Sequence, residues 1–143
     1  MDNAHIIKRW FEEVWNEGRE ATIDELLAPT AHGYGLAGNE MMPVSGPEGF
    51  KPFWRQLRGA CPDIRFTIHD TVSEGDRVVA RWTAEMTHHG EHLGVAATRR
   101  QVTVTGMTLV RVAGGQIQEG WNNWDELTMA KELGSIPSVR AEV

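Results

Sequence analysis

The sequence has little cysteine, no excess of positive charge and no long hydrophobic run. Cys61 is the single cysteine among 143 residues, so the chain cannot form an internal disulfide, and we expect a reducing compartment. Acidic residues outnumber basic ones by 20 to 14, and Arg99-Arg100 is a typical basic cluster, which argues against nucleic acid as a partner. Because no apolar run approaches a bilayer's thickness and the amphipathic N-terminal segment does not resemble a signal peptide, we expect a cytoplasmic protein without membrane contact.

Several catalytic motifs are also missing. The chain contains neither a glycine-rich phosphate loop nor a Gly-x-Ser-x-Gly nucleophile motif, and Cys61 precedes a proline without a nucleophile's context. The histidine-rich stretch 88–92 lies in a predicted strand end and loop, and no cysteine or carboxylate cluster completes a metal site by spacing. We therefore expect neither a metal nor a cofactor.

The hydrophobic periodicity predicts one α+β domain over 1–134, followed by a short tail over 135–143. Helical spacing of apolar residues predicts helices near 3–18, 22–27, 47–60 and 125–133, and the glycine-rich stretch 32–38 is either a short strand or a loop. Alternating apolar residues predict four long strands near 64–72, 78–88, 100–112 and 116–123. Helices followed by a run of strands indicate a curved antiparallel sheet wrapped around the N-terminal helices, a cone-shaped α+β barrel with an apolar interior.

Five segments of the sequence follow one another in a recognisable order and spacing. They are Glu74–Trp82, Thr87–Glu91, Arg100–Gly106, Gly115–Asp125 and Glu132–Gly134. Together with the helix that ends in Trp15-Asn16-Glu17-Gly18 and the helix that opens with Gly46-Pro47, they resemble the SnoaL-like polyketide cyclase family, often labelled ester cyclases. The resemblance covers nearly the whole chain. It implies the cone fold shared with ketosteroid isomerase and limonene epoxide hydrolase, chemistry without cofactor or metal, and a homodimer or larger oligomer.

The resemblance also implies where the family's catalytic groups would lie. In the cyclases, an aspartate on the last strand removes a substrate proton, and the enolate attacks an aldehyde of the same molecule. Asn122 stands at the place of this aspartate, and Thr108 stands at the place of a histidine on the preceding strand. An amide does not take up a proton near neutral pH, so the proton acceptor would have to be another group.

Three residues are the candidate catalytic groups. His88 extends the inward stripe of the second long strand and could be a base that faces the cavity, or a strand-end histidine that bonds a backbone carbonyl. Asp125 could be a carboxylate base beside Trp121 and Trp124, or the N-cap of the last helix. Asn122 could hold a substrate carbonyl and stabilise an oxyanion, or pair with a neighbouring strand.

Six further residues are candidates for contacting substrate, as cavity walls or as polar groups near the mouth. They are Trp54, Trp82, Thr108, Trp121, Tyr34 and His32. We expect Thr108 to lie across from Asn122 on the adjacent strand, and the outward sheet face with Thr83 and Thr103 to be available as a dimer surface.

The sequence therefore predicts an enzyme of the cyclase, isomerase or lyase type that abstracts a proton from a small hydrophobic carbonyl compound. One alternative is a domain of the same fold that binds a ligand without turnover. The other is an epoxide hydrolase, which would need two carboxylates and an arginine around one water, a set that the strand positions do not supply.

Overall fold

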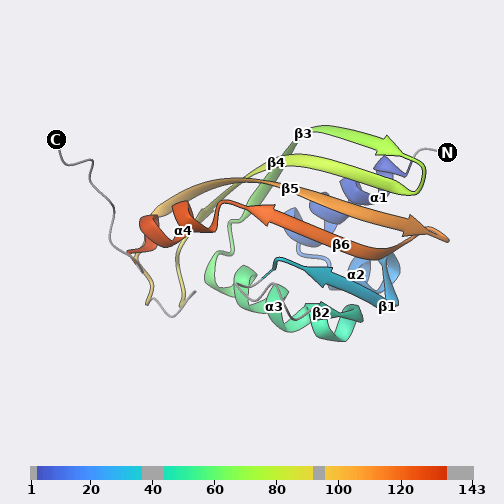
Figure 1. Cartoon of the computed structure of the whole chain (residues 1–143). Coiled ribbons are helices and arrows are strands. Elements are labelled where there is room, and N and C mark those ends of the chain that lie inside the picture. Colours follow the sequence, from blue (N-terminus) through green and yellow to red (C-terminus); the bar gives the residue numbers. More distant parts are fainter. Residues whose placement is uncertain (1–2, 37–43, 92–95, 135–143) are drawn as a thin grey trace.

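The computed structural model describes residues 3–36, 44–91 and 96–134 (Figure 1). The expected tail over 135–143 lies outside these residues. The helical elements are α1 (Ala4–Arg9), η1 (Trp10–Asn16), α2 (Glu20–Leu26), α3 (Gly46–Ala60) and α4 (Glu126–Leu133). The strands are β1 (Leu27–Tyr34), β2 (Val44–Ser45), β3 (Arg65–Glu74), β4 (Arg77–Thr87), β5 (Gln101–Ala113) and β6 (Gln116–Trp124). Mixed helices and a curved, open sheet confirm the predicted α+β class.

The first predicted helix is not α-helical throughout. Its second half, η1, is a π-helix, and the N–H of Glu17 just beyond it donates to the carbonyl of Glu12, five residues earlier. The buried side chains Trp10, Phe11, Val14 and Trp15 all belong to this segment. This short helix thus brings three large aromatic rings into the interior, with Phe11 and Trp15 against the sheet and Trp10 against Phe50 of α3.

The strand order in the sheet is β2-β1-β6-β5-β4-β3 (Figure 1). The four long strands pair antiparallel as predicted, but β1 pairs parallel to β6, which the antiparallel prediction did not include. β1 begins at Leu27, where the sequence pattern predicted the end of a helix, because the chain turns into the sheet directly after Leu26. A bulge at Gln118 shifts the register of β6, so that Gly120, Asn122 and Trp124 face inward.

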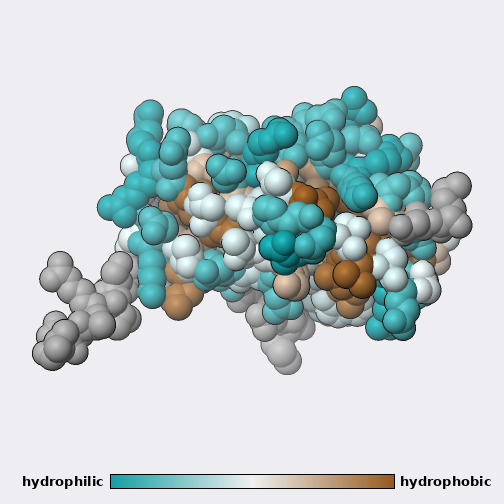
Figure 2. Space-filling view, turned by 90° about the horizontal axis from the view of Figure 1, so that it is seen from above, coloured by the Kyte–Doolittle hydropathy of each residue, from teal (hydrophilic) through white to brown (hydrophobic). Residues whose placement is uncertain are grey.

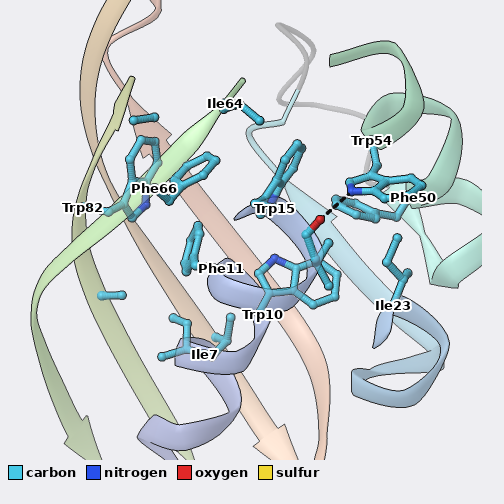
Figure 3. Packing of buried hydrophobic residues seen from close by; sticks show 14 of the residues in the cluster. Ile7, Trp10, Phe11, Trp15, Ile23, Phe50, Trp54, Ile64, Phe66 and Trp82 are labelled. Carbon is cyan, nitrogen blue, oxygen red and sulfur yellow. Dashed lines mark hydrogen bonds between the residues drawn. The ribbon is translucent and has the colours of Figure 1, made fainter. Parts of the chain in front are cut away.

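The helices α1, η1, α2 and α3 lie along the concave side of the sheet, and α4 follows the end of β6 (Figure 1). Aromatic rings from η1, α3, β3 and β4 meet in the interior (Figure 3). Phe11 packs against both Phe66 and Trp82, with ring centroids 5.0 and 6.0 Å apart, and Phe66 and Trp82 meet at 4.9 Å in an edge arrangement. This cluster packs the helices against the sheet. Its rings Phe11, Phe66 and Trp82 also line the interior cavity.

The outer surface is mainly polar. The view from above shows mostly hydrophilic side chains with hydrophobic ones scattered between them (Figure 2). On the outward side of the long strands, Arg81, Glu85, Thr103 and Thr105 are exposed, whereas Thr83 is half-buried. Dimerisation through this face stays a prediction. Among the residues described, no helix is both long and apolar enough to cross a membrane.

Candidate functional site

An interior cavity of about 310 Å³ lies between the concave face of the sheet and the helices. Its walls are mainly apolar, and several of the lining side chains are aromatic. Trp10 and Trp15 contribute from η1, Phe50 and Phe53 from α3, and Trp82 from β4. The volume is at the small end of the range for ligand sites in proteins, so the cavity fits one small and predominantly apolar molecule.

The polar side chains that line the cavity are few. Thr108 and Asn122 come from neighbouring strands, and Gln56, His32 and Glu126 come from α3, β1 and the start of α4. Thr108 is buried, Asn122 and Glu126 are half-buried, and Gln56 and His32 are exposed. The described lining is thus mainly apolar, with the buried Thr108 and the half-buried Asn122 side by side in its wall and Gln56, His32 and Glu126 as further polar groups.

A chain of hydrogen bonds fixes the side chains of Thr108 and Asn122. The indole N–H of Trp82 donates to Oγ1 of Thr108 over 3.0 Å, so the single hydroxyl hydrogen of Thr108 is directed to Oδ1 of Asn122, 2.8 Å away. Nδ2 of Asn122 in turn donates to the carbonyl of Tyr34 over 2.9 Å. Because every donor and acceptor role follows from Trp82, the orientation of the Asn122 amide is determined. Among the hydrogen bonds of the described residues, the Asn122 Nδ2 group makes this one donation, and its second N–H is not engaged.

Gly106 makes this arrangement sterically possible. It lies opposite both Trp82 on β4 and Trp124 on β6. A Cβ atom at position 106 would come within 2.5 Å of the Trp82 ring and 2.8 Å of the Trp124 Cβ. The missing side chain therefore lets the indole of Trp82 lie across β5 and reach Thr108.

The structure brings four of the nine predicted site residues to the cavity, namely His32, Trp82, Thr108 and Asn122. The prediction that Thr108 lies across from Asn122 is confirmed by the strand register. Their roles toward a substrate stay predictions.

Three predicted wall residues are not among those that line the cavity. Trp54 is buried between α3 and η1, where its indole N–H donates to the carbonyl of Val14 over 2.9 Å (Figure 3). Tyr34 and Trp121 stack on each other with ring centroids 6.0 Å apart. Trp121 lies between the inward residues Gly120 and Asn122 of β6, so its side chain is on the opposite face of the sheet.

Asp125 is also absent from the cavity lining and takes the capping role that we had weighed against catalysis. Its carboxylate accepts from the backbone N–H of Thr128 over 2.9 Å and from the Thr128 hydroxyl over 2.6 Å. The side chain is exposed, and the hydrogen bonds from Thr128 lower the pKa of this carboxyl below its usual value. A carboxylate with both oxygens engaged and a lowered pKa is a poor proton acceptor.

His88 is fully buried but is not among the residues that line the cavity. Its Nδ1 accepts from the backbone N–H of Thr98 over 3.2 Å, and the Thr98 hydroxyl lies 3.0 Å away. A backbone N–H can only donate, so the proton of the neutral ring is on Nε2, which has no hydrogen-bond partner in the described parts of the chain. Burial lowers the pKa of His88 below its ordinary 6.5, which favours this neutral form.

The buried, neutral His88 should make stability depend on pH. Its pKa is lower in the folded than in the unfolded chain, so below about pH 6.5 the unfolded chain binds a proton that the folded chain does not. We expect this group to remove up to about 1.4 kcal/mol of unfolding free energy per pH unit below that point, until the lowered pKa is reached. Urea unfolding at about pH 7 and about pH 5.5 measures the loss.

The matched variants for this prediction are His88→Asn and His89→Asn. Asparagine at position 88 keeps an acceptor near Nδ1 without a titrating ring, so it should flatten the pH dependence. His89 is the exposed neighbour, and its replacement should leave the contribution of His88 to the pH dependence in place. Equal slopes in the wild type and His88→Asn would show that His88 does not cause the loss.

Glu126, Trp124 and Gln56 are among the lining residues that were not singled out as site residues in the sequence. Glu126 and Trp124 flank Asp125, which drew attention instead, and Gln56 lies on α3 between exposed and half-buried neighbours. A signal for Glu126 exists, because Met129 and Leu133 are the buried apolar positions of α4 and Glu126 lies three residues before Met129. The helical repeat is compatible with an inward Glu126, whereas Asp125 is the N-cap and its side chain is engaged with Thr128.

Metal-binding and thiol chemistry find no support among the described side chains. No group of three or more histidine, cysteine, aspartate or glutamate residues is placed to hold a metal ion in the part of the chain that the structure describes. Cys61 is fully buried, and burial raises the pKa of its thiol to about 11, so it does not form a thiolate near neutral pH.

The family model of the SnoaL-like polyketide cyclases matches residues 5–133. The chain belongs to this family. A comparison with curated proteins found no match. Membership agrees with the observed α+β architecture, and it identifies the general kind of enzyme to which the chain is related.

Solved structures from the same group show the same architecture. A proposed SnoaL-like polyketide cyclase from Jannaschia sp. CCS1 is 26% identical with a TM-score of 0.84, and the match covers 94% of this chain and 93% of that one. IdmH from Streptomyces antibioticus, a proposed polyketide cyclase, is 33% identical with a TM-score of 0.80, covering 94% and 99%. AclR from Streptomyces galilaeus, a proposed hydroxylase, is 24% identical with a TM-score of 0.82, covering 97% and 85%, and this likeness extends to the fold alone.

Proposed function

We propose that this SnoaL-like protein is a cofactor-free enzyme of the cyclase, isomerase or lyase type that abstracts a proton from a small hydrophobic, polyketide-like carbonyl compound. The observation that carries the proposal is an apolar cavity of about 310 Å³ with the oriented Asn122 amide in its wall. An apolar carbonyl compound would bury its rings against tryptophan and phenylalanine side chains and direct its oxygen to the remaining N–H of Asn122.

The same amide supports the chemistry as well as the binding. Removal of a proton next to a carbonyl transfers negative charge to the carbonyl oxygen. A donor that is already fixed by Thr108 and Tyr34 can stabilise this charge without reorganising. The aromatic surroundings exclude water and strengthen the interaction. Asn122 would thus stabilise the enolate, and a separate group would accept the proton.

Ligand binding without turnover is the second candidate function. It is favoured by Asn122, which stands where the family resemblance places the aspartate base. Epoxide hydrolysis is less well supported. Among the described lining residues there is one carboxylate, that of Glu126, and no arginine, whereas this reaction would use two carboxylates and an arginine.

The experiment uses 2-tetralone, a bicyclic ketone with acidic protons next to its carbonyl, and tetralin, the same hydrocarbon without the oxygen. We expect saturation-transfer NMR to show binding of 2-tetralone with a dissociation constant of about 1 mM or tighter. Tetralin should bind more weakly, because it cannot accept from Asn122. In D2O, the protein should accelerate exchange of the protons next to the carbonyl, which proton NMR follows directly.

The outcomes separate the candidate functions. Binding with accelerated exchange supports the enzyme. Binding without exchange supports a ligand-binding domain and overturns the proposed catalysis. Equal binding of tetralin and 2-tetralone would contradict the role given to the Asn122 amide.

A further inference from the structure

Two titratable side chains line the cavity in the described part of the chain, Glu126 and His32. His32 is exposed on β1, whereas Glu126 is half-buried at the beginning of α4. The proposed function requires a proton acceptor, and neither Asn122 nor the capping carboxylate of Asp125 is suited to this task. Of the two lining groups, the geometry of α4 favours Glu126.

The position of Glu126 follows from the geometry of α4. Met129 also lines the cavity, and Met129 and Leu133 are the buried residues of the helix. Glu126 precedes Met129 by three residues and so shares its face of the helix. Helical side chains lean toward the N-terminus, which directs Glu126 toward the end of β6, where Trp124 and Asn122 line the same cavity.

The Glu126 carboxylate is also uncommitted. The other acidic groups near the cavity have partners, since Asp125 holds Thr128 and Glu119 pairs with Arg111 over 2.8 Å. Among the hydrogen bonds and ion pairs of the described residues, none involves the side chain of Glu126. A carboxylate without a structural partner that faces an apolar chamber has its lone pairs free for a ligand's proton.

We propose that Glu126 is the base of this site and accepts the proton next to the carbonyl of a compound whose oxygen is held by Asn122. In the step, the carbon–hydrogen bond breaks, the proton moves to the Glu126 carboxylate, and the electron pair forms the carbon–carbon double bond of an enolate. The negative charge rests on the oxygen at the Asn122 N–H. Glu126, now a neutral acid, returns its proton to a different carbon in an isomerisation, or to the alkoxide formed when the enolate attacks a second carbonyl.

This inference rests on the proposed function and names the group that performs its first step. The test compares wild type, Glu126→Gln, Glu126→Asp and Glu132→Gln in the deuterium exchange of 2-tetralone. Glu132 is an exposed glutamate on the same helix and serves as the matched control. We expect Glu126→Gln to slow exchange about 100-fold while 2-tetralone still binds within about threefold of wild type. Glu126→Asp should recover at least about tenfold of the loss, and Glu132→Gln should behave as wild type.

The failures of the two proposals are distinguishable. Wild-type exchange that persists in Glu126→Gln overturns the assignment of Glu126 and leaves the enzyme function standing. The same holds if His32→Gln abolishes exchange and Glu126→Gln does not. If the wild type binds 2-tetralone without exchanging it, both proposals are overturned. An equal loss in Glu126→Gln and Glu132→Gln would indicate an effect on the helix rather than on proton transfer, and it also overturns the assignment.

Discussion

Gly35→Ala should lower the free energy of unfolding by roughly 3 kcal/mol or more, because it combines backbone strain with the loss of two hydrogen bonds. Gly35 has a φ of 74°, in the left-handed region that residues with a Cβ rarely adopt. A Cβ atom there would come within 2.0 Å of the backbone oxygen of Asn122, which cannot move aside without displacing β6. Chemical unfolding followed by tryptophan fluorescence measures the loss.

The close approach of Gly35 to Asn122 also connects the end of β1 to the proposed site on β6. The carbonyl of Gly35 accepts from the Trp124 indole over 3.1 Å, and the carbonyl of Tyr34 accepts from Asn122 over 2.9 Å. A methyl group would push this end of β1 away from β6 and release both donors. We therefore expect Gly35→Ala to weaken 2-tetralone binding as well as stability, since Trp124 and Asn122 both line the cavity.

Gly75→Ala is the matched control for this prediction. Gly75 lies in the turn between β3 and β4 with a φ of 58°, and a Cβ there would meet no atom within 4 Å. This variant has the strain of a positive φ without the collision, and it should cost about 1 kcal/mol. If Gly35→Ala costs no more than Gly75→Ala, the close approach of β1 to Asn122 does not contribute to stability.

The long strands could be predicted because their pattern is local. Residues alternate inward and outward along β4 and β5, and the glycine turns at 75 and at 114–115 separate the strands cleanly. The parallel pairing of β1 with β6 could not be predicted in this way. It joins segments about 90 residues apart, and β1 contains glycine, proline and few alternating apolar residues.

In the candidate site, too, features set by local sequence could be predicted and features set by long-range packing could not. Thr108 and Asn122 could be placed together because antiparallel register follows from the turn between β5 and β6. Because His88 continues the inward stripe of β4, the sequence left open whether it faces the cavity or has a structural role at the strand end. In the structure the backbone N–H of Thr98 donates to the His88 ring, and the carbonyl of Arg100 accepts from the His88 backbone N–H. The ring is therefore packed against the segment before β5 and does not face the cavity. Asp125 had two predicted roles, base or N-cap of the last helix, and the structure shows the N-cap. Glu126 was not a predicted site residue, because an acidic residue in the first turn of a helix is common without any role in a site.

Thr108→Val should cost about 2 kcal/mol of unfolding free energy although the two side chains have nearly the same shape. The buried indole N–H of Trp82 would lose its acceptor, and Oδ1 of Asn122 would lose its donor. Thr103→Val is the matched control, because Thr103 lies on the same strand, is exposed, and should change stability by less than about 0.5 kcal/mol. Thr108→Ser keeps the hydroxyl and should lose only about 1 kcal/mol for the missing methyl group.

A double-mutant cycle with Trp82→Phe tests whether the indole hydrogen bond is the cause. Phenylalanine keeps a ring but has no N–H, so Thr108→Val should cost about 1 kcal/mol less in that background than in the wild type. Additive effects would contradict the explanation. The cycle also addresses function, because without the Thr108 hydroxyl the Asn122 amide is no longer held in one orientation. Binding of tetralin should then survive in Thr108→Val while the exchange of 2-tetralone falls about tenfold, as expected if the fixed amide stabilises the enolate oxygen.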